Sequence, residues 1–177
     1  MNINTFLEQF SGDWFSQRTN YNLVQNNVDN SKANVTIKLL PANDPQVVQL
    51  SEKYNLNQDL SLGALASNWD NSPDWGKPKQ QGSSLMLLFT DPDDSNTGKV
   101  VRVVGSDKVV TGRYEVAKDE SITLTLDDQD QSMKERITFS SDNLRIRNCV
   151  SKKGEQVTQT TFYSEIRRVV PKEDQDS

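Results

Sequence analysis

The sequence of 177 residues contains no histidine and only one cysteine, Cys149. Without histidine, catalytic dyads and triads that use a histidine base are excluded, as is any histidine-ligated metal site. A single cysteine cannot form an intrachain disulfide, which fits a reducing compartment. An activated thiolate would need help from Arg or Lys, so we expect Cys149 to be a buried structural residue, and we expect no metal site.

Long apolar segments are also missing. The longest apolar run covers residues 85–89 and is far too short to span a bilayer. Residues 1–10 do not show the basic stretch and apolar run of a signal peptide. We therefore expect a cytoplasmic protein with no membrane span. The formal net charge of −5 disfavours nucleic acid as a partner, because phosphate binding needs a concentrated basic face.

Hydrophobic residues make up only 33% of the chain, which is low for a packed core. Either disorder or a barrel with a polar, ligand-binding interior would account for this value. The chain shows clear strand alternation, for example where Ile122, Leu124 and Leu126 are separated by threonines. This alternation favours the barrel.

The spacing of the elements predicts an all-β fold with two short helices. One helix is expected over residues 2–10, and a second begins at Pro45 after the capping residue Asp44, follows the second strand and lids or flanks one opening. About ten evenly spaced strands predict an up-and-down, lipocalin-like barrel. They are expected over residues 13–25, 33–40, 63–69, 83–89, 99–104, 109–116, 121–126, 131–139, 144–151 and 156–169. Residues 1–170 would form a single domain, followed by a polar tail at 171–177.

The first strand carries a Gly-x-Trp motif, with which lipocalin-like barrels begin. Its Trp14 would close one end of the cup, and Arg167 of the last strand would pack over it. Alternate side chains of a strand share a face, so Trp14, Ser16 and Arg18 would all point inward. A cation inside the cup indicates an anionic ligand. The alternative is a surface arginine on a bulged strand.

A second pair of arginines lies on a late strand. Arg145 and Arg147 share one face, and Leu144 and Ile146 share the other. A guanidinium fork matches a carboxylate of a ligand. The pattern alone favours the opposite arrangement, in which the arginines face solvent and the apolar pair lines the cup.

Two tryptophans flank a turn in the middle of the chain. Trp69 is followed directly by Asp70, and Trp75 lies in a loop over residues 70–81. A loop tryptophan can cap an opening and stack on a flat conjugated ligand. Alternatively, Trp69 belongs to the core and Trp75 packs the loop.

Two carboxylates, Glu135 and Glu165, lie on late strands. Inside a barrel a carboxylate must be paired, or it becomes protonated. Arg18 or Arg147 could provide a purely structural partner. The carboxylates could instead face a cationic nitrogen of a ligand.

Together these residues resemble the CpcS/CpeS (S/U-type) family of phycobiliprotein lyases, nearly end to end. The stretches that carry the resemblance are Gly12–Thr19, Asp44-Pro45, Ser67–Asp70 with Trp75, Gly82–Ser84, Gly112–Tyr114, Glu135-Arg136, Asn143–Arg147 and Ser164–Arg167. The resemblance implies a lipocalin-like or fatty-acid-binding-protein-like barrel that binds a linear tetrapyrrole. It also implies that phycocyanobilin or a related bilin is attached through a thioether to a cysteine of an apo-phycobiliprotein subunit, which supplies the thiol.

The resemblance also implies a set of site residues. By matching position the bilin site would contain Arg18, Trp69, Asp70, Trp75, Glu135, Arg147 and Glu165. We add Arg145 to the binding residues, and we assign catalysis to Asp70, Glu135 and Glu165, since a carboxylate that bonds the pyrrole N–H groups favours the protonated, more electrophilic bilin.

The sequence departs from the family in places. Many members carry His-His after Arg-Thr, whereas here Asn20–Asn22 follow. These departures resemble a divergent U-like branch, some of which works only beside an S-type partner. The chain could therefore be active alone, as a homodimer, or as the accessory subunit of a hetero-oligomeric lyase. A non-catalytic bilin carrier and a fatty-acid carrier are further alternatives.

Overall fold

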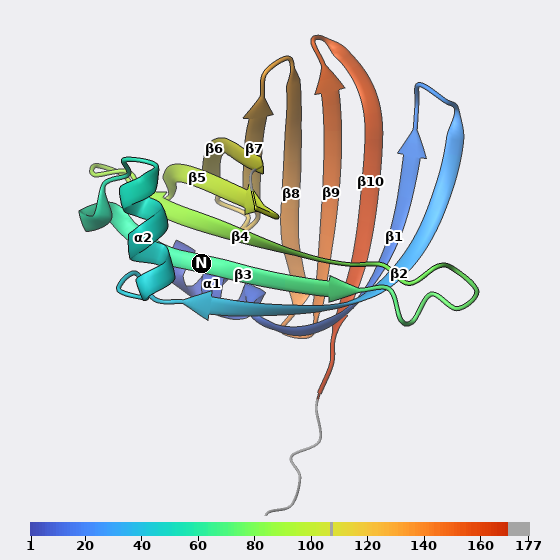
Figure 1. Cartoon of the computed structure of the whole chain (residues 1–177), viewed down its shortest axis with the longest axis horizontal. Coiled ribbons are helices and arrows are strands. Elements are labelled where there is room, and N and C mark those ends of the chain that lie inside the picture. Colours follow the sequence, from blue (N-terminus) through green and yellow to red (C-terminus); the bar gives the residue numbers. More distant parts are fainter. Residues whose placement is uncertain (107, 170–177) are drawn as a thin grey trace, which may run out of the picture.

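A computed structural model describes residues 1–106 and 108–169, which form a closed barrel of ten antiparallel strands with two α-helices (Figure 1). The expected fold class is confirmed. The strands are β1 (Gly12–Asn22), β2 (Asn27–Leu40), β3 (Ser61–Asp70), β4 (Gln81–Thr90), β5 (Thr97–Val104), β6 (Lys108–Val116), β7 (Ile122–Asp128), β8 (Gln131–Ser141), β9 (Leu144–Lys153) and β10 (Gln156–Arg167). The helices are α1 (Ile3–Phe10), α2 (Pro45–Lys53) and the short 3-10 helix η1 (Gln58–Leu60). The expected tail at 171–177 lies outside the described residues.

The strands follow one another around the ring in chain order, and β1 pairs with β10 to close it. Alternate residues of each strand point into the barrel and out of it. Closure leaves no free strand edge, so the backbone groups of the sheet find their partners within the ring. No helix in the described part of the chain has the length and apolar character needed to cross a membrane.

The hairpin between β1 and β2 differs from the prediction. The turn occupies residues 23–26, and β2 begins at Asn27 rather than at residue 33. Asn26 adopts a left-handed conformation with φ 52°, and the side chain of Asn22 accepts hydrogen bonds from the amides of Val24 and Gln25. The mostly polar residues 27–32 pair with β1. This pairing holds them in a strand although such residues prefer turns.

One end of the barrel is closed by α1. Its residues Phe6 and Phe10 stack with ring centroids 5.3 Å apart, and both pack in the main core with the fully buried Trp14. Trp14 donates from Nε1 to the carbonyl of Phe10 at 3.1 Å. In Figure 1, α1 lies at the lower end of the barrel, so this end has a solid apolar plug.

Arg167 fastens this plug, as expected. Its guanidinium lies 4.3 Å from the centre of the Trp14 ring. It also donates to the carbonyls of Gln9 and Ser11, each at 2.7 Å, and to that of Asp142 at 3.0 Å. One side chain therefore connects the end of β10 with the junction of α1 and β1.

The second helix covers a wall of the barrel. Asp44 caps α2 by accepting from the amide of Gln46, and Pro45 occupies the first turn, as predicted. Val47 packs in a second apolar cluster with outward-facing residues of β3, β4 and β5, among them Leu87 and Val101. The helix thus lies on the outside of the barrel (Figure 1) and leaves its interior free.

We expect Arg167→Met to lower the free energy of unfolding by about 2–3 kcal/mol, because hydrogen bonds to charged groups each contribute about 1.5–3 kcal/mol. Urea unfolding measures the change. The matched control is Arg168→Met, since Arg168 is exposed and bonds only through its backbone. Equal stability of the two variants would contradict the role of Arg167.

Candidate functional site

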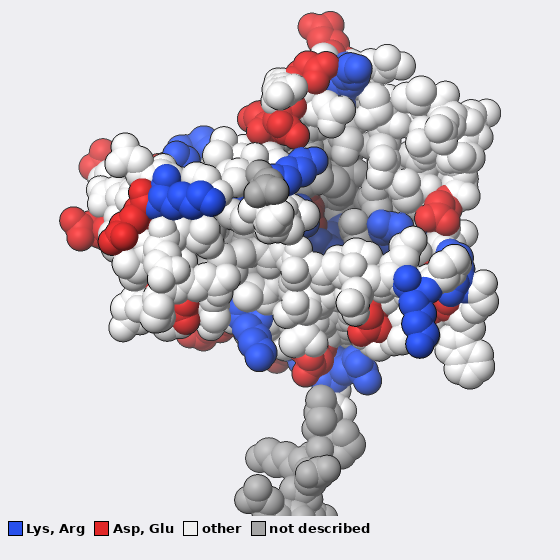
Figure 2. All heavy atoms as spheres, in the orientation of Figure 1, with Lys and Arg blue, Asp and Glu red and all other residues white. Residues whose placement is uncertain are grey.

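A cavity of about 580 Å³ lies inside the barrel above the plug. A space of this size suits a small organic ligand. Residues from most of the strands and from the loop between β3 and β4 line the cavity. Figure 2 shows the molecule hollowed near its centre, with basic side chains visible inside the hollow.

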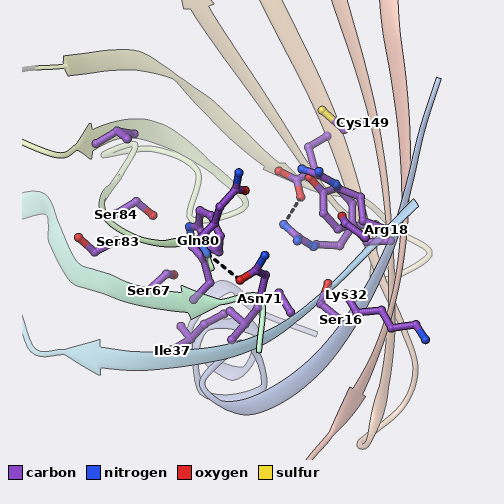
Figure 3. A pocket seen from close by; sticks show the side chains of 18 of the residues that line it. Ser16, Arg18, Lys32, Ile37, Ser67, Asn71, Gln80, Ser83, Ser84 and Cys149 are labelled. Carbon is purple, nitrogen blue, oxygen red and sulfur yellow. Dashed lines mark hydrogen bonds and ion pairs between the residues drawn. The ribbon is translucent and has the colours of Figure 1, made fainter. Parts of the chain in front are cut away.

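The loop over residues 71–80 covers part of the cavity. It is closed on itself, because Asn71 accepts from the amide of Gln80 at 2.7 Å and donates to the carbonyl of Pro78 at 2.9 Å. It is also tied to β2, where Lys77 bonds the carbonyl of Asn30. Figure 3 shows the side chain of Asn71 directed toward the backbone of Gln80 at the cavity. These two residues line the cavity themselves.

Four charged side chains gather at the floor of the cavity, and three of them line it. Arg147 donates to Glu165 at 2.6 Å and to Glu135 at 2.8 Å. Arg145 donates to Glu165 at 2.8 Å. We call these two arginines and two glutamates the buried charge cluster. The two positive charges equal the two negative ones, so each ion of the cluster has an oppositely charged partner in the low-dielectric interior.

The ionisation of the cluster follows from burial and mutual attraction. Burial lowers the pKa of Arg145 to about 10, although Glu165 opposes the shift. Burial opposes the charge of Arg147, but the two carboxylates outweigh it and raise its pKa. Burial also disfavours the charged form of Glu165, yet both arginines outweigh it and lower the pKa of that carboxyl to about 2. All three groups are therefore charged at neutral pH.

The cluster rests directly on the plug. The guanidinium of Arg145 lies 4.1 Å from the ring centres of both Phe10 and Trp14, and it donates to the carbonyl of Phe10 at 3.0 Å. The interpretation of Arg145 and Arg147 as a solvent face is therefore wrong. Alternation defines two faces of a strand without saying which one is inside, and here the partners Glu135 and Glu165 make the charged face the inner one.

Arg18 lines the cavity wall above the cluster. The strand that carries it pairs in continuous register on both sides, so the alternative of a bulged strand is wrong. Its side chain is 41% exposed and lies 3.6 Å from Asp29. Its Nε is buried without a hydrogen-bond partner. Figure 3 shows Arg18 on the same side of the cavity as Cys149.

Trp69 also lines the cavity and is 39% exposed, so it is not a core residue. It lies over Gly82, its partner on β4. A Cβ at Gly82 would stand 2.6 Å from Nε1 of Trp69, so the glycine provides the space for the indole. The ring remains free to contact a ligand at the cavity.

Asp70 and Trp75 do not join this site. Asp70 follows Trp69 directly and therefore points to the other face of β3, where it accepts from the amide of Ser72 at 3.0 Å. Hydrogen bonds from Ser72 lower its pKa. Trp75 is 92% exposed and does not line the cavity. Neither residue lines the cavity in this structure, because strand alternation turns Asp70 outward and Trp75 extends from the loop into solvent. Their roles in bilin binding stay predictions.

Cys149 is buried, as predicted, and it lines the cavity on the same side as Arg147. Burial raises the pKa of its thiol to about 11, and Glu135 adds to the shift. The thiol is therefore protonated at neutral pH and a poor nucleophile. In the described part of the chain no group of three or more Cys, Asp or Glu side chains could hold a metal ion.

The sequence interpretation missed several cavity residues. Tyr163 stacks on Arg147, with the guanidinium 3.9 Å from the ring centre, and burial raises its pKa. The sequence could have indicated this residue, because Tyr163 lies two positions before Glu165 and therefore shares its face of the strand. Arg102 also lines the cavity, and the sequence indicated it by a cation between two pairs of valines in β5. Asp29 also lines the cavity, but no pattern indicated it, because it lies between the predicted strands 13–25 and 33–40.

Comparisons with known proteins agree with this architecture. The model of the CpeS-like protein family matches residues 2–168. Chromophore lyase CpcS/CpeS 1 of Synechocystis sp. PCC 6803 is 35% identical over 98% of this chain and 94% of its own length. The phycocyanobilin lyase subunit CpcS of Picosynechococcus is 25% identical over 92% of this chain and 84% of its own length. The solved structure of the S-type phycobiliprotein lyase CpeS of Guillardia theta has the same fold, with a TM-score of 0.81 at 21% identity over 96% of this chain and 94% of that one.

We expect Glu165→Gln to lower the free energy of unfolding at neutral pH by about 3–5 kcal/mol, because it leaves two buried guanidinium groups with a single carboxylate. The pKa of Glu165 is about 2 in the folded chain and 4.5 ordinarily. Its contribution is therefore complete above pH 4.5 and is lost as the pH falls toward 2.

Denaturant unfolding across that pH range measures both effects. The wild-type stability should fall more steeply with acid than that of Glu165→Gln. The control is Glu155→Gln, in the exposed turn between β9 and β10, which should behave as the wild type does. Equal acid slopes for the wild type and Glu165→Gln would contradict the ionised state of the cluster.

Proposed function

The chain belongs to the CpeS-like protein family, and from this membership and the charged cavity we propose that it is a bilin lyase. It would bind a linear tetrapyrrole of the phycocyanobilin type and attach it to a cysteine of an apo-phycobiliprotein subunit. The observation that carries this proposal is the buried charge cluster at the floor of a cavity of about 580 Å³.

The chemical groups of a linear tetrapyrrole match the side chains that line the cavity. A linear tetrapyrrole combines a flat conjugated chain, four ring nitrogens and two propionates. Trp69 offers an aromatic face at the cavity, and stacked ring pairs contribute about 0.5–1.5 kcal/mol beyond area burial. Arg18 offers a guanidinium with a buried, unpartnered Nε, which suits a carboxylate.

Glu135 is the carboxylate best placed to contact the ring nitrogens. Its Oε1 accepts from Arg147 at 2.8 Å, whereas its Oε2 makes no hydrogen bond with a described residue. Glu135 lines the cavity, and Glu165 lies beneath the arginines without lining it. We therefore assign pyrrole N–H binding to Glu135 and the orientation of both arginines to Glu165.

The chemistry follows from this arrangement. The thiol of the acceptor adds across the exocyclic ethylidene double bond: sulfur bonds to the ethylidene carbon, and the tetrapyrrole takes up the proton. A carboxylate that accepts from the pyrrole N–H groups stabilises the protonated ring system, which is the better electrophile. Since Cys149 is protonated at neutral pH, the attacking thiol comes from the acceptor. This chain contributes orientation and protection.

A role as one subunit of a hetero-oligomeric lyase is the second candidate. The observation that favours it is the Picosynechococcus relative, which is named as a lyase subunit. In this arrangement the chain would bind the bilin, and an S-type partner would complete the transfer. A non-catalytic bilin carrier would share the cavity and lack the transfer altogether.

Addition of phycocyanobilin to the purified protein should give a red-shifted and intensified visible band. Glu135→Gln should weaken the binding about tenfold, because a charge-assisted hydrogen bond contributes about 1.5–3 kcal/mol. Absorbance titration gives the Kd. The control is Glu115→Gln, which removes an exposed carboxylate of β6, and circular dichroism confirms that each variant is folded. An unchanged spectrum of the wild type would refute bilin binding.

Covalent transfer is tested by co-expression with an apo-phycobiliprotein and a bilin source. Pigment that stays on the acceptor after denaturation, with this chain as the only lyase, is the expected result. Pigment only after addition of an S-type relative would identify the chain as an accessory subunit. Bilin binding without any transfer in either case would identify a carrier.

A further inference from the structure

Arg102 places an uncompensated charge in an apolar part of the cavity wall. It lies on the inner face of β5 and lines the cavity. Val100 and Val104 flank it along the strand, and Met86 and Val110 are its partners on β4 and β6. These four neighbours offer no carboxylate. Arg102 makes no hydrogen bond or ion pair with any residue that the structure describes.

The other cations at the cavity have partners. Arg145 and Arg147 are neutralised within the buried charge cluster. Arg18 and Lys77 both lie near Asp29, at 3.6 and 3.8 Å. Lys32 also borders the cavity, but its side chain is exposed and extends away from it (Figure 3).

An unpaired cation among apolar side chains contributes nothing to the stability of the barrel. Partial desolvation of a charge costs free energy unless a partner restores the lost interactions. Nothing in the packing of β5 therefore accounts for Arg102. An anionic group of a ligand would account for it, because it would supply the missing partner in a site screened from water.

The position of Arg102 relative to the cluster is also informative. Around the ring, β6, β7 and β8 separate β5 from β9, which carries Arg147. Arg102 therefore faces the cluster across the cavity. A ligand that reaches Glu135 with a ring nitrogen can extend toward β5 with another part of the molecule.

We infer that Arg102 is a specificity-determining residue that binds an acidic group of the ligand on the wall opposite the buried charge cluster. This inference rests on the proposed function, in which the acidic group is a propionate of the bilin. Arg18 then remains for the second propionate. The cavity would accordingly select ligands with a free carboxylate over neutral ligands of the same shape.

The test compares phycocyanobilin with its dimethyl ester, in which both propionates are neutral. Absorbance titration gives the Kd of each ligand for the wild type, Arg102→Gln and Arg102→Lys. Arg102→Gln should weaken the binding of the free acid about tenfold or more and leave the binding of the ester unchanged. Arg102→Lys should retain part of the preference for the acid.

The matched control is Lys99→Gln, because Lys99 is an exposed cation on the outer side of the same strand. It removes one positive charge from the chain and should leave both Kd values unchanged. Thermal unfolding tests whether Arg102 has a structural role instead. In that case Arg102→Gln would change the Tm, whereas we expect it to keep the wild-type Tm. Equal weakening of acid and ester, or no weakening of either, would overturn the inference.

A second pair of probes separates this inference from the proposed function. The dyes 1-anilinonaphthalene-8-sulfonate and N-phenyl-1-naphthylamine differ only in the anionic sulfonate. If the wild type binds no bilin, the proposed function fails, and fluorescence titration with the two dyes still decides the role of Arg102. Selective loss of the anionic dye in Arg102→Gln would support the inference. Equal affinity of wild type and variant for that dye would overturn it.

Discussion

The interaction on which the rest of the structure depends is the contact of Arg145 with Glu165 on one side and with the aromatic plug on the other. Its guanidinium is held between Phe10 and Trp14 and is neutralised by a carboxylate that is itself fully buried. The closed end of the barrel and the floor of the cavity thus share one side chain. Because a buried ion without its partner costs several kcal/mol, the plug, the cluster and the last two strands stabilise one another. The cavity begins where this unit ends, and its polar floor is fixed by the same contacts that close the barrel.

This arrangement explains why a chain with so few hydrophobic residues folds. The apolar side chains are concentrated at α1 and the plug, and under α2 on the outside of β3, β4 and β5. The remaining interior is a cavity whose lining combines apolar side chains, such as Leu124 and Met133, with charged side chains that bond one another. An interior filled with apolar side chains would be more stable and would leave no room for a ligand. The composition is therefore a consequence of the cavity.

The sequence predicted the order of the elements and the closed end well, because strand alternation, the helix cap at Asp44 and the Trp14–Arg167 contact are local or recurrent features. It predicted the inner face of β9 wrongly. Leu144 and Ile146 are both apolar and both point outward, and only contacts with distant residues such as Glu135 reveal which face is inside. Asp70 was grouped with its neighbour Trp69, although adjacent strand residues point to opposite faces, and only Trp69 lines the cavity. Trp75 lies on a loop, whose direction depends on hydrogen bonds that no periodicity encodes.

The charges of the cavity bear on how substrate and acceptor meet. The chain as a whole is acidic, yet arginines and lysines outnumber the carboxylates that line the cavity. The potential inside therefore differs in sign from that of the whole chain, and an anionic ligand gains attraction only once it has entered. The same contrast keeps Cys149 out of the reaction, because Glu135 and burial both hold its thiol protonated although it lies within the cavity. A lyase with a reactive thiol of its own would trap the bilin on itself. A ligand in this cavity would meet arginines, an indole, a carboxylate and a thiol that is protonated at neutral pH, so under the proposed function a bound bilin would stay intact until another protein presents a reactive thiol.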